Sequence, residues 1–271
     1  MKNVLTIAGS DSSGGAGIQA DLKTMCALGV YGMSVITAVT AQNTRSVRDV
    51  QEIDTGMVAA QIDAVFEDIP VDALKVGMVS SAQIIRTIRD KLLEYGAKNI
   101  VVDPVMVSKS GYHLLREEAV AAVAELVAIA DIVTPNIPEA ELLVGEAIRG
   151  REDMRRAAEK ILEMGAGSVL IKGGHMDGDA SDLLVTGEGE RWLDAKRIDT
   201  RNTHGTGCTL SSAVACGLAR GYDIPRAVDL AKAYITQAIT DALPVGKGVG
   251  PVGHLIQLYR DAGLDTEGGA I

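Results

Sequence analysis

A short stretch late in the chain combines two glycines, a threonine and a thiol: Gly205-Thr206-Gly207-Cys208. It stands where an irregular polar segment gives way to a long run of small residues typical of a buried helix. The N–H groups in a helix's first turn have no partners within the helix, and the helix dipole adds partial positive charge there. We therefore predict that this turn holds a phosphate or another oxyanion.

Cys208 lies in the field of the same predicted helix terminus. That field favours thiolate over thiol, and a thiolate can act as a base or as a nucleophile. The alternative is a small buried apolar group, which is the usual role of a cysteine in such a helix. The motif alone leaves both interpretations open.

A second glycine-rich loop, at residues 9–21, follows the first apolar run. It is not a Walker A loop, because Gly15 and Ala16 stand where that motif needs Lys and Ser or Thr. Residues 15–20 match a dinucleotide fingerprint, but residues 40–43 lack the acid that binds ribose hydroxyls, so NAD is not expected. The loop suits a small polar ligand, and the alternative is a glycine turn that packs a helix.

The elements that must position these loops alternate along the chain. Short apolar, β-branched runs predict strands at residues 4–8, 34–40, 73–76, 100–102, 132–133 and 168–171. Apolar positions at helical spacing predict helices at residues 16–28, 57–66, 82–95, 116–129, 154–164, 206–220, 224–242 and 252–261. This alternation predicts an α/β fold: a mostly parallel sheet with helices on both faces and ligand sites at the carboxyl ends of its strands.

Residues 182–194 depart from the alternation, because two strand-like runs flank a glycine-rich turn. They predict an antiparallel hairpin at the edge of the sheet. No linker, repeat or low-complexity segment divides the chain, so we predict one domain over residues 1–271, with a frayed tail at residues 263–271.

Composition limits the partners of the chain. Its 271 residues, 47% of them hydrophobic, can bury one large core. The net charge of −10, with no long run of basic residues, argues against nucleic acid and favours small-molecule partners. Three cysteines without paired spacing form neither a disulfide framework nor a thiolate zinc site. The apolar runs are too short for a signal peptide or a membrane span, so we expect a cytoplasmic protein with no membrane partner.

Six motifs occur in order along the chain, at residues 8–21, 37–44, 102–106, 134–139, 172–175 and 205–208. Together they resemble the hydroxymethylpyrimidine and phosphomethylpyrimidine kinases of the ribokinase-like superfamily. The resemblance implies a three-layer α/β/α fold, ATP and Mg²⁺ as cofactors, and a homodimer. It also implies two phosphorylations in thiamine biosynthesis, first of 4-amino-5-hydroxymethyl-2-methylpyrimidine and then of its monophosphate.

The resemblance implies a role for each residue of the late loop. Cys208 would take the acceptor's proton, while the N–H groups of Gly205, Thr206 and Gly207 face the transferring phosphoryl group. The implied substrate-binding residues are Gly9, Asp21, Gln42, Met78 and Val105.

Two of these substrate-binding residues have simpler alternatives. The Gln42 amide can both donate and accept, which suits a ring nitrogen beside an exocyclic amine, although a buried glutamine satisfied by backbone is the alternative. Asp21 could instead complement the dipole of its helix.

Charged residues at strand ends complete the predicted site. Asp103 follows a buried strand, and with Glu139 it is expected to act on Mg²⁺, directly or through water. The alternative for Glu139 is a charge that complements a helix N-terminus. Lys172 is expected to reach the donor phosphates as a point charge. The expected nucleotide-binding residues are Asn136, Lys172, Gly205 and Gly207.

Several other residues carry weaker expectations. Residues 177–182 lack EF-hand spacing and predict a hairpin turn rather than a calcium site. Cys26 and Cys216 fall within helical patterns and are expected in the core. His204 could cap the helix or contact the ligand, and His175 is a weaker site candidate.

Three alternative functions stay open. A pyridoxal kinase would share the superfamily and differ in the ring it selects. A cysteine hydrolase would use Cys208 as nucleophile and would leave Asp103, Glu139 and Lys172 without a role. A nonenzymatic pyrimidine sensor would keep the pocket without the chemistry.

Overall fold

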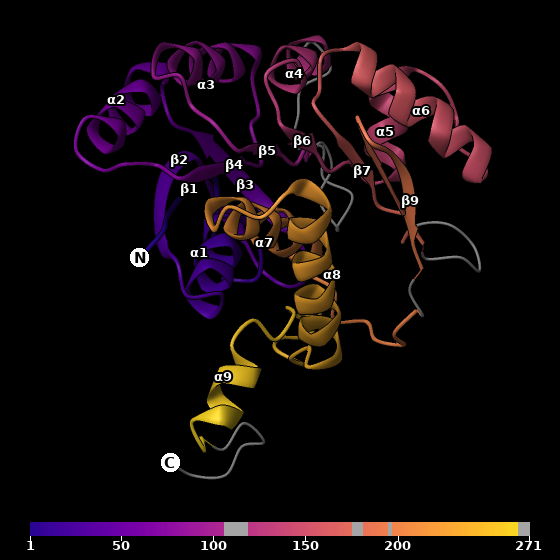
Figure 1. Ribbon diagram of the computed structural model, residues 1–271. Helices are drawn as coiled ribbons and strands as arrows, with labels where there is room; N and C mark the ends of the chain where they lie inside the picture. Colours follow the sequence, from indigo (N-terminus) through magenta and orange to yellow (C-terminus); the bar gives the residue numbers. More distant parts are fainter. Residues whose placement is uncertain (106–118, 175–180, 195–196, 265–271) are drawn as a thin grey trace.

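The computed structural model describes residues 1–105, 119–174, 181–194 and 197–264 (Figure 1). Within these ranges one sheet has the strand order β3-β2-β1-β4-β5-β6-β7-β8-β9. Its strands are β1 (Asn3–Asp11), β2 (Tyr31–Gln42), β3 (Val47–Glu52), β4 (Ala73–Val76), β5 (Ile100–Val102), β6 (Ile132–Val133), β7 (Val169–Ile171), β8 (Asp182–Thr186) and β9 (Gly189–Leu193). The helices are α1 (Gly17–Ala27), α2 (Thr55–Phe66), α3 (Ala82–Glu94), α4 (Val120–Val127), α5 (Ile137–Val144), α6 (Arg151–Glu163), α7 (Thr206–Ala219), α8 (Ile224–Thr240) and α9 (Ile256–Asp261).

The centre of the sheet is parallel and both of its edges are antiparallel. Strands β2, β1, β4, β5, β6 and β7 pair in parallel. The hairpin predicted at residues 182–194 is confirmed as β8 and β9, and β8 pairs antiparallel with β7. Strand β3 forms the other edge, antiparallel to β2, and the sequence did not predict it. Its segment is largely exposed and charged, so it lacks the apolar run by which the other strands were recognised.

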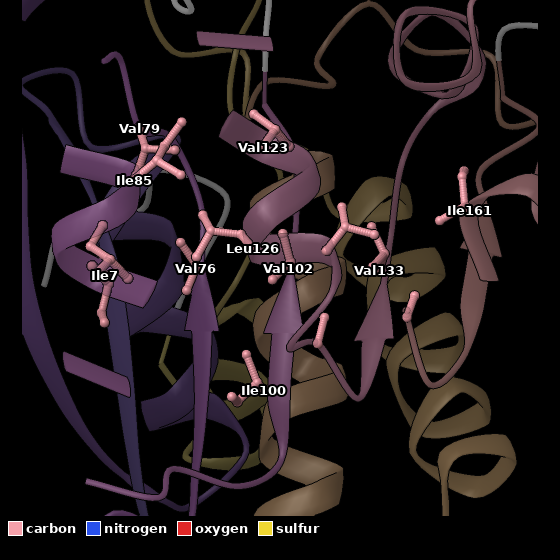
Figure 2. Close-up of a cluster of buried hydrophobic side chains, with 14 of the residues drawn as sticks. Ile7, Val76, Val79, Ile85, Ile100, Val102, Val123, Leu126, Val133 and Ile161 are labelled. Atoms are coloured by element: carbon pink, nitrogen blue, oxygen red, sulfur yellow. The ribbon is translucent and has the colours of Figure 1, made fainter. Parts of the chain in front are cut away.

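Side chains of the central strands alternate between two apolar layers, as a period of two requires. In β5, Ile100 and Val102 pack with side chains of α3, α4 and α6, and Figure 2 shows this layer. Val101, between them, packs on the other face with side chains of α1, α7 and α8. Figure 1 shows α2 to α6 on one side of the sheet and α1, α7 and α8 on the other. The predicted three-layer α/β/α fold is confirmed.

Capping side chains mark the starts of three helices, one of which the sequence did not predict. Asp54 and Ser81 cap α2 and α3 by accepting from backbone N–H groups, as such residues do. Helix α5 was not predicted, yet it begins with a capping box between Asn136 and Glu139 and has Pro138 in its first turn. Its eight residues are too few for helical spacing to stand out.

Helix α7 is the most buried helix near the predicted anion site. Every residue from Thr209 to Ala219 is buried, and α7 packs against α8, α1 and the strands of the sheet centre. Cys216 lies in this core, as predicted. Cys26 on α1 is exposed, so the prediction that it is a core residue is wrong.

Three expectations concern segments outside the described ranges: the tail after residue 264, most of the predicted turn at residues 177–182, and His175. Among the helices that the structure does describe, none combines the length and the apolar character that a bilayer span requires.

Candidate active site

The carboxyl ends of the parallel strands and the start of α7 border a cavity of about 130 Å³ that is partly open to solvent. A cavity at this edge is expected for a parallel α/β sheet. Of the predicted site residues, all but Asp21 line it: Gly9, Gln42, Met78, Asp103, Val105, Asn136, Glu139, Lys172, Gly205, Thr206, Gly207 and Cys208. Ser10, Asp11, Ala16 and Gly17 also line the cavity; the sequence predicted a ligand for their loop at residues 9–21 without naming them singly. Thr40, which the sequence reasoning missed, and His204 line it too.

The start of α7 has the geometry that an anion site needs. Gly205 adopts φ 81°, and a Cβ there would collide with the carbonyl oxygen of Gly15, so the two glycine-rich loops touch at this point. The amides of Gly207 and Cys208 have no hydrogen-bond partner among the described residues. Two free donors at a helix N-terminus therefore open onto the cavity.

The Cys208 thiol is protonated near neutrality rather than ionised. Burial raises the pKa of Cys208 to about 11, opposed by the Lys75 ammonium and supported by the carboxylates of Asp21 and Asp103. The prediction that the helix terminus favours thiolate is therefore wrong for the protein by itself. The cost of burying a charge exceeds the gain from the Lys75 ammonium and from the backbone N–H of Gly17.

Asp103 is a buried carboxylate that two side chains fix. Oδ1 accepts from Lys172 Nζ at 2.8 Å and from Thr134 Oγ1 at 3.2 Å, and Oδ2 lies 3.3 Å from Ser211 Oγ. Burial alone would raise the pKa of Asp103, but the ammonium groups of Lys172 and Lys75 outweigh it and hold the pKa below its usual value. This side chain is ionised and fixed.

Glu139 combines the two roles that the sequence left open. It closes the capping box of α5, with Oε2 accepting from the Asn136 N–H at 2.8 Å, and it also lines the cavity. Burial raises the pKa of Glu139 to about 7, with the Lys172 ammonium opposing the rise and the Asp103 carboxylate adding to it. Lys172 Nζ lies 3.9 Å from Glu139 Oε2 and 2.8 Å from Asp103 Oδ1, so one ammonium faces two carboxylates.

This charge arrangement fits a magnesium ion. Mg²⁺ prefers oxygen ligands, keeps several waters and uses one or two protein carboxylates together with substrate phosphates. Asp103 and Glu139 supply two carboxylates whose charge Lys172 only partly compensates. In the part of the chain that the structure describes, no group of three or more His, Cys, Asp or Glu side chains is arranged to hold a metal by itself.

Asp21 is not at the cavity, contrary to the prediction. It is fully buried, and both of its oxygens lie 3.0 Å from Lys75 Nζ. It also accepts from Thr6 Oγ1 at 2.6 Å and Ser212 Oγ at 2.7 Å, so β1, β4, α1 and α7 meet at this carboxylate. Burial alone would lower the pKa of Lys75, but the Asp21 carboxylate keeps that pKa above its usual value. The Lys75–Asp21 ion pair therefore links the strands and helices beneath the cavity.

Asp11 organises the first glycine-rich loop. Its Oδ2 accepts from the N–H groups of Gly15 at 3.1 Å and Ala16 at 2.8 Å, and it lies 2.8 Å from Nε2 of His204. Its Oδ1 accepts from the N–H of Ser13. An aspartate at the first position of a turn, accepting from the N–H two residues later, is a recognisable signal, but nothing local indicates its partner 193 residues away.

Comparison with known proteins shows the family. The sequence profile of the phosphomethylpyrimidine kinase family matches residues 11–253. A hydroxymethylpyrimidine/phosphomethylpyrimidine kinase from Rhizobium meliloti is 55% identical over 262 residues, which cover 95% of this chain and 98% of that protein.

Two solved structures share the fold. A phosphomethylpyrimidine kinase from Clostridium difficile has a TM-score of 0.80 at 53% identity and covers 88% of this chain and 100% of its own. An ADP complex of Bacillus subtilis pyridoxal kinase has a TM-score of 0.89 at 41% identity and covers 95% of this chain and 99% of its own.

The fold and these relatives define a ribokinase-like kinase of small molecules. The free amides at the start of α7 agree with that class, and so does the group of Lys172, Asp103 and Glu139 at the same edge of the sheet. More particularly, the chain belongs to the phosphomethylpyrimidine kinase family.

Proposed function

We propose that this chain phosphorylates 4-amino-5-hydroxymethyl-2-methylpyrimidine to its monophosphate and then to its diphosphate, with ATP as donor, in thiamine biosynthesis. The relative from Rhizobium meliloti carries both kinase activities in its name. The observation that carries the proposal is the cavity itself, in which the free amides of Gly207 and Cys208 lie with Gln42 and Lys172.

The donor side of the proposed site is the wall built by α5, β7 and the start of α7. When bound, Mg²⁺-ATP supplies the phosphoryl group, and the metal neutralises charge on the phosphates. Asp103 and Glu139 would hold the metal, and Lys172 would reach the phosphates. Asn136 and the glycines of the late loop line the same wall. The ADP complex of the pyridoxal kinase supports a nucleotide at this fold's site.

The late loop carries the proposed chemistry. The amides of Gly207 and Cys208, with that of Gly205, hold the phosphoryl group while it moves, since they lie at a fixed helix terminus. The Thr206 N–H donates to the Thr203 carbonyl oxygen at 3.4 Å, so the expectation that it faces the phosphoryl group is wrong. Cys208 in its thiolate form, a minor fraction near neutrality because its pKa is raised to about 11, takes the proton of the hydroxymethyl group and becomes the thiol, so the acceptor oxygen attacks as an alkoxide-like nucleophile. In the second step the acceptor is already a phosphate anion, so the amides matter more than the base.

In this proposal Gln42 recognises the pyrimidine ring of the substrate. Its amide can donate to a ring nitrogen and accept from an exocyclic amine, which is the pattern of an aminopyrimidine. Gly9, Met78 and Val105 provide the wall beside it, and Met78 Sδ would lie 3.0 Å from a Cβ at Gly9. Any larger residue at position 9 would narrow the cavity.

A substrate panel tests the proposal: purified full-length protein with Mg²⁺-ATP and the aminopyrimidine alcohol, its monophosphate, or pyridoxal. We expect turnover of both aminopyrimidine compounds. Pyridoxal kinase is the second candidate, because the pyridoxal kinase structure has the higher of the two TM-scores. Turnover of pyridoxal alone would replace the proposal. Product release without ATP would indicate a cysteine hydrolase, and binding without turnover would indicate a sensor.

Three further expectations are proposals as well. We propose that residues 1–271 act as one catalytic domain, because the described site residues lie on one sheet and on the helices and loops that join its strands. The homodimer and the cytoplasmic location rest on the family resemblance and on the composition. Sedimentation of the purified chain and fractionation of cells test them.

A further inference from the structure

Gln42 belongs to a set of polar contacts that the proposed reaction does not use. His204 Nε2 lies 2.8 Å from Asp11 Oδ2 and 3.3 Å from Gln42 Nε2. On the other side of Gln42, Thr40 Oγ1 lies 3.3 Å from Gln42 Oε1. All four residues line the cavity, so the orientation of the Gln42 amide decides what a ligand meets there.

The proton on His204 is assigned by Asp11. Burial opposes ionisation of Asp11, but hydrogen bonds from His204 and Ser13 bring its pKa to about 2, so the carboxylate only accepts. Nε2 of His204 must therefore carry a proton and donate it to Asp11. A protonated ring nitrogen has no lone pair to offer, so it cannot accept from the Gln42 NH₂ group. This holds for neutral and for charged imidazole.

The proton on Thr40 leads to the same conclusion. Its hydroxyl has one proton, and the backbone oxygen of Ser10 accepts it at 2.9 Å. Thr40 Oγ1 is then left with lone pairs, which suit a donor rather than the Gln42 carbonyl oxygen. Turning the Gln42 carboxamide by half a turn exchanges its oxygen and nitrogen, which differ little in size. Both neighbours are then satisfied.

We propose that Asp11 and His204 fix the Gln42 carboxamide with its oxygen toward His204 and its nitrogen toward Thr40. His204 is thereby a positioning residue for ring selection. One amide proton and one carbonyl lone pair of Gln42 remain for the ligand. The inference rests on the proposed function, under which the exocyclic amine donates on the His204 side and the adjacent ring nitrogen accepts on the Thr40 side.

The position of His204 makes this role specific. The ring is buried against Gly15, where a Cβ would collide with the imidazole. The backbone of His204 is held by Gly250 and Val252. The imidazole therefore cannot turn away from Gln42 without disturbing both glycine-rich loops.

A kinetic comparison of two substrates tests the inference. The first is the aminopyrimidine alcohol and the second is its analogue with hydrogen in place of the exocyclic amine. We expect wild type to prefer the first, and His204→Phe to reduce that preference, the ratio of the two kcat/KM values, by about tenfold, the value of one hydrogen bond. His204→Gln, which keeps an N–H donor, should restore part of it. General damage to the site would slow both substrates alike and leave the ratio unchanged.

A double variant separates positioning from independent effects. If His204 acts through Gln42, His204→Phe should cost no further preference in a Gln42→Leu background. Additive losses, or an unchanged preference in His204→Phe, would overturn the inference.

A second readout does not depend on turnover. In long-range ¹H–¹⁵N spectra of the labelled full chain, with His204→Phe identifying the signals, we expect the His204 proton on Nε2. A lone pair on Nε2 would overturn the inference. If wild type phosphorylates neither alcohol, the proposed function fails, and this spectrum still decides the state of His204.

Discussion

The buried Lys75–Asp21 pair predicts a large and specific loss of stability. Lys75→Met removes the ammonium and leaves the Asp21 carboxylate fully buried, with Thr6 and Ser212 as its remaining donors among the residues that the structure describes. Breaking a buried ion pair from one side costs about 3–5 kcal/mol, because a charge remains without compensation. The matched control is Lys2→Met, whose pair with Asp72 has side chains 51% and 25% exposed. An exposed pair is worth about 0–1 kcal/mol.

Thermal unfolding monitored by circular dichroism measures the difference. For a chain of this size each kcal/mol shifts Tm by about 2–4 °C, so Lys75→Met should lower Tm by about 6–20 °C and Lys2→Met by a few degrees at most. The double variant Lys75→Met/Asp21→Asn should recover much of the loss, because no unpaired charge stays in the core.

Two results would refute the reasoning. One is a Tm for Lys75→Met no lower than that of Lys2→Met. The other is a double variant that is no more stable than Lys75→Met, which would mean that packing of the lysine stem, rather than charge, explains the loss.

The other predictions concern catalysis. Cys208→Ala should keep ligand binding but slow the first phosphorylation by about 10²–10⁴, measured in single turnovers. Because burial raises the pKa of Cys208 to about 11, the wild-type first step should accelerate as pH rises from 7 toward 10, and Cys208→Ala should lose that rise. Glu139, with a pKa of about 7, is protonated below that pH, so the apparent Mg²⁺ affinity should weaken as pH falls below 7 in wild type but not in Glu139→Gln. Gln42→Leu should raise KM for the aminopyrimidine more than KM for ATP, and equal effects on both would make Gln42 structural.

Much of the fold was predictable because buried strands are short apolar runs. Strands β4, β5 and β6 begin and end at the predicted residues. Strand β3 escaped prediction because it lies at an edge and presents charge to solvent, so its sequence resembles a loop. Helix α5 escaped because it is short, although its capping box was readable at Asn136 and Glu139.

The site was predictable in its membership and less so in its electrostatics. Asp103 and Lys172 follow buried strands, and parallel strands bring such residues to one edge. The spacing around Cys208 indicated a helix terminus, but the pKa of a thiol depends on burial, which spacing does not report. The role of Asp21 was also hidden from the sequence. Its position on a helix does not reveal that its carboxylate accepts hydrogen bonds from Lys75, 54 residues later.

The central claim is that the first turn of α7 holds the phosphoryl group while it passes to the ring alcohol. A crystal structure of this chain with a nonhydrolysable ATP analogue, Mg²⁺ and the aminopyrimidine alcohol tests it most directly. We predict that oxygens of the terminal phosphate lie about 3 Å from the amides of Gly207 and Cys208, with the hydroxymethyl oxygen beside the Cys208 thiol. A terminal phosphate directed away from these amides would contradict the account.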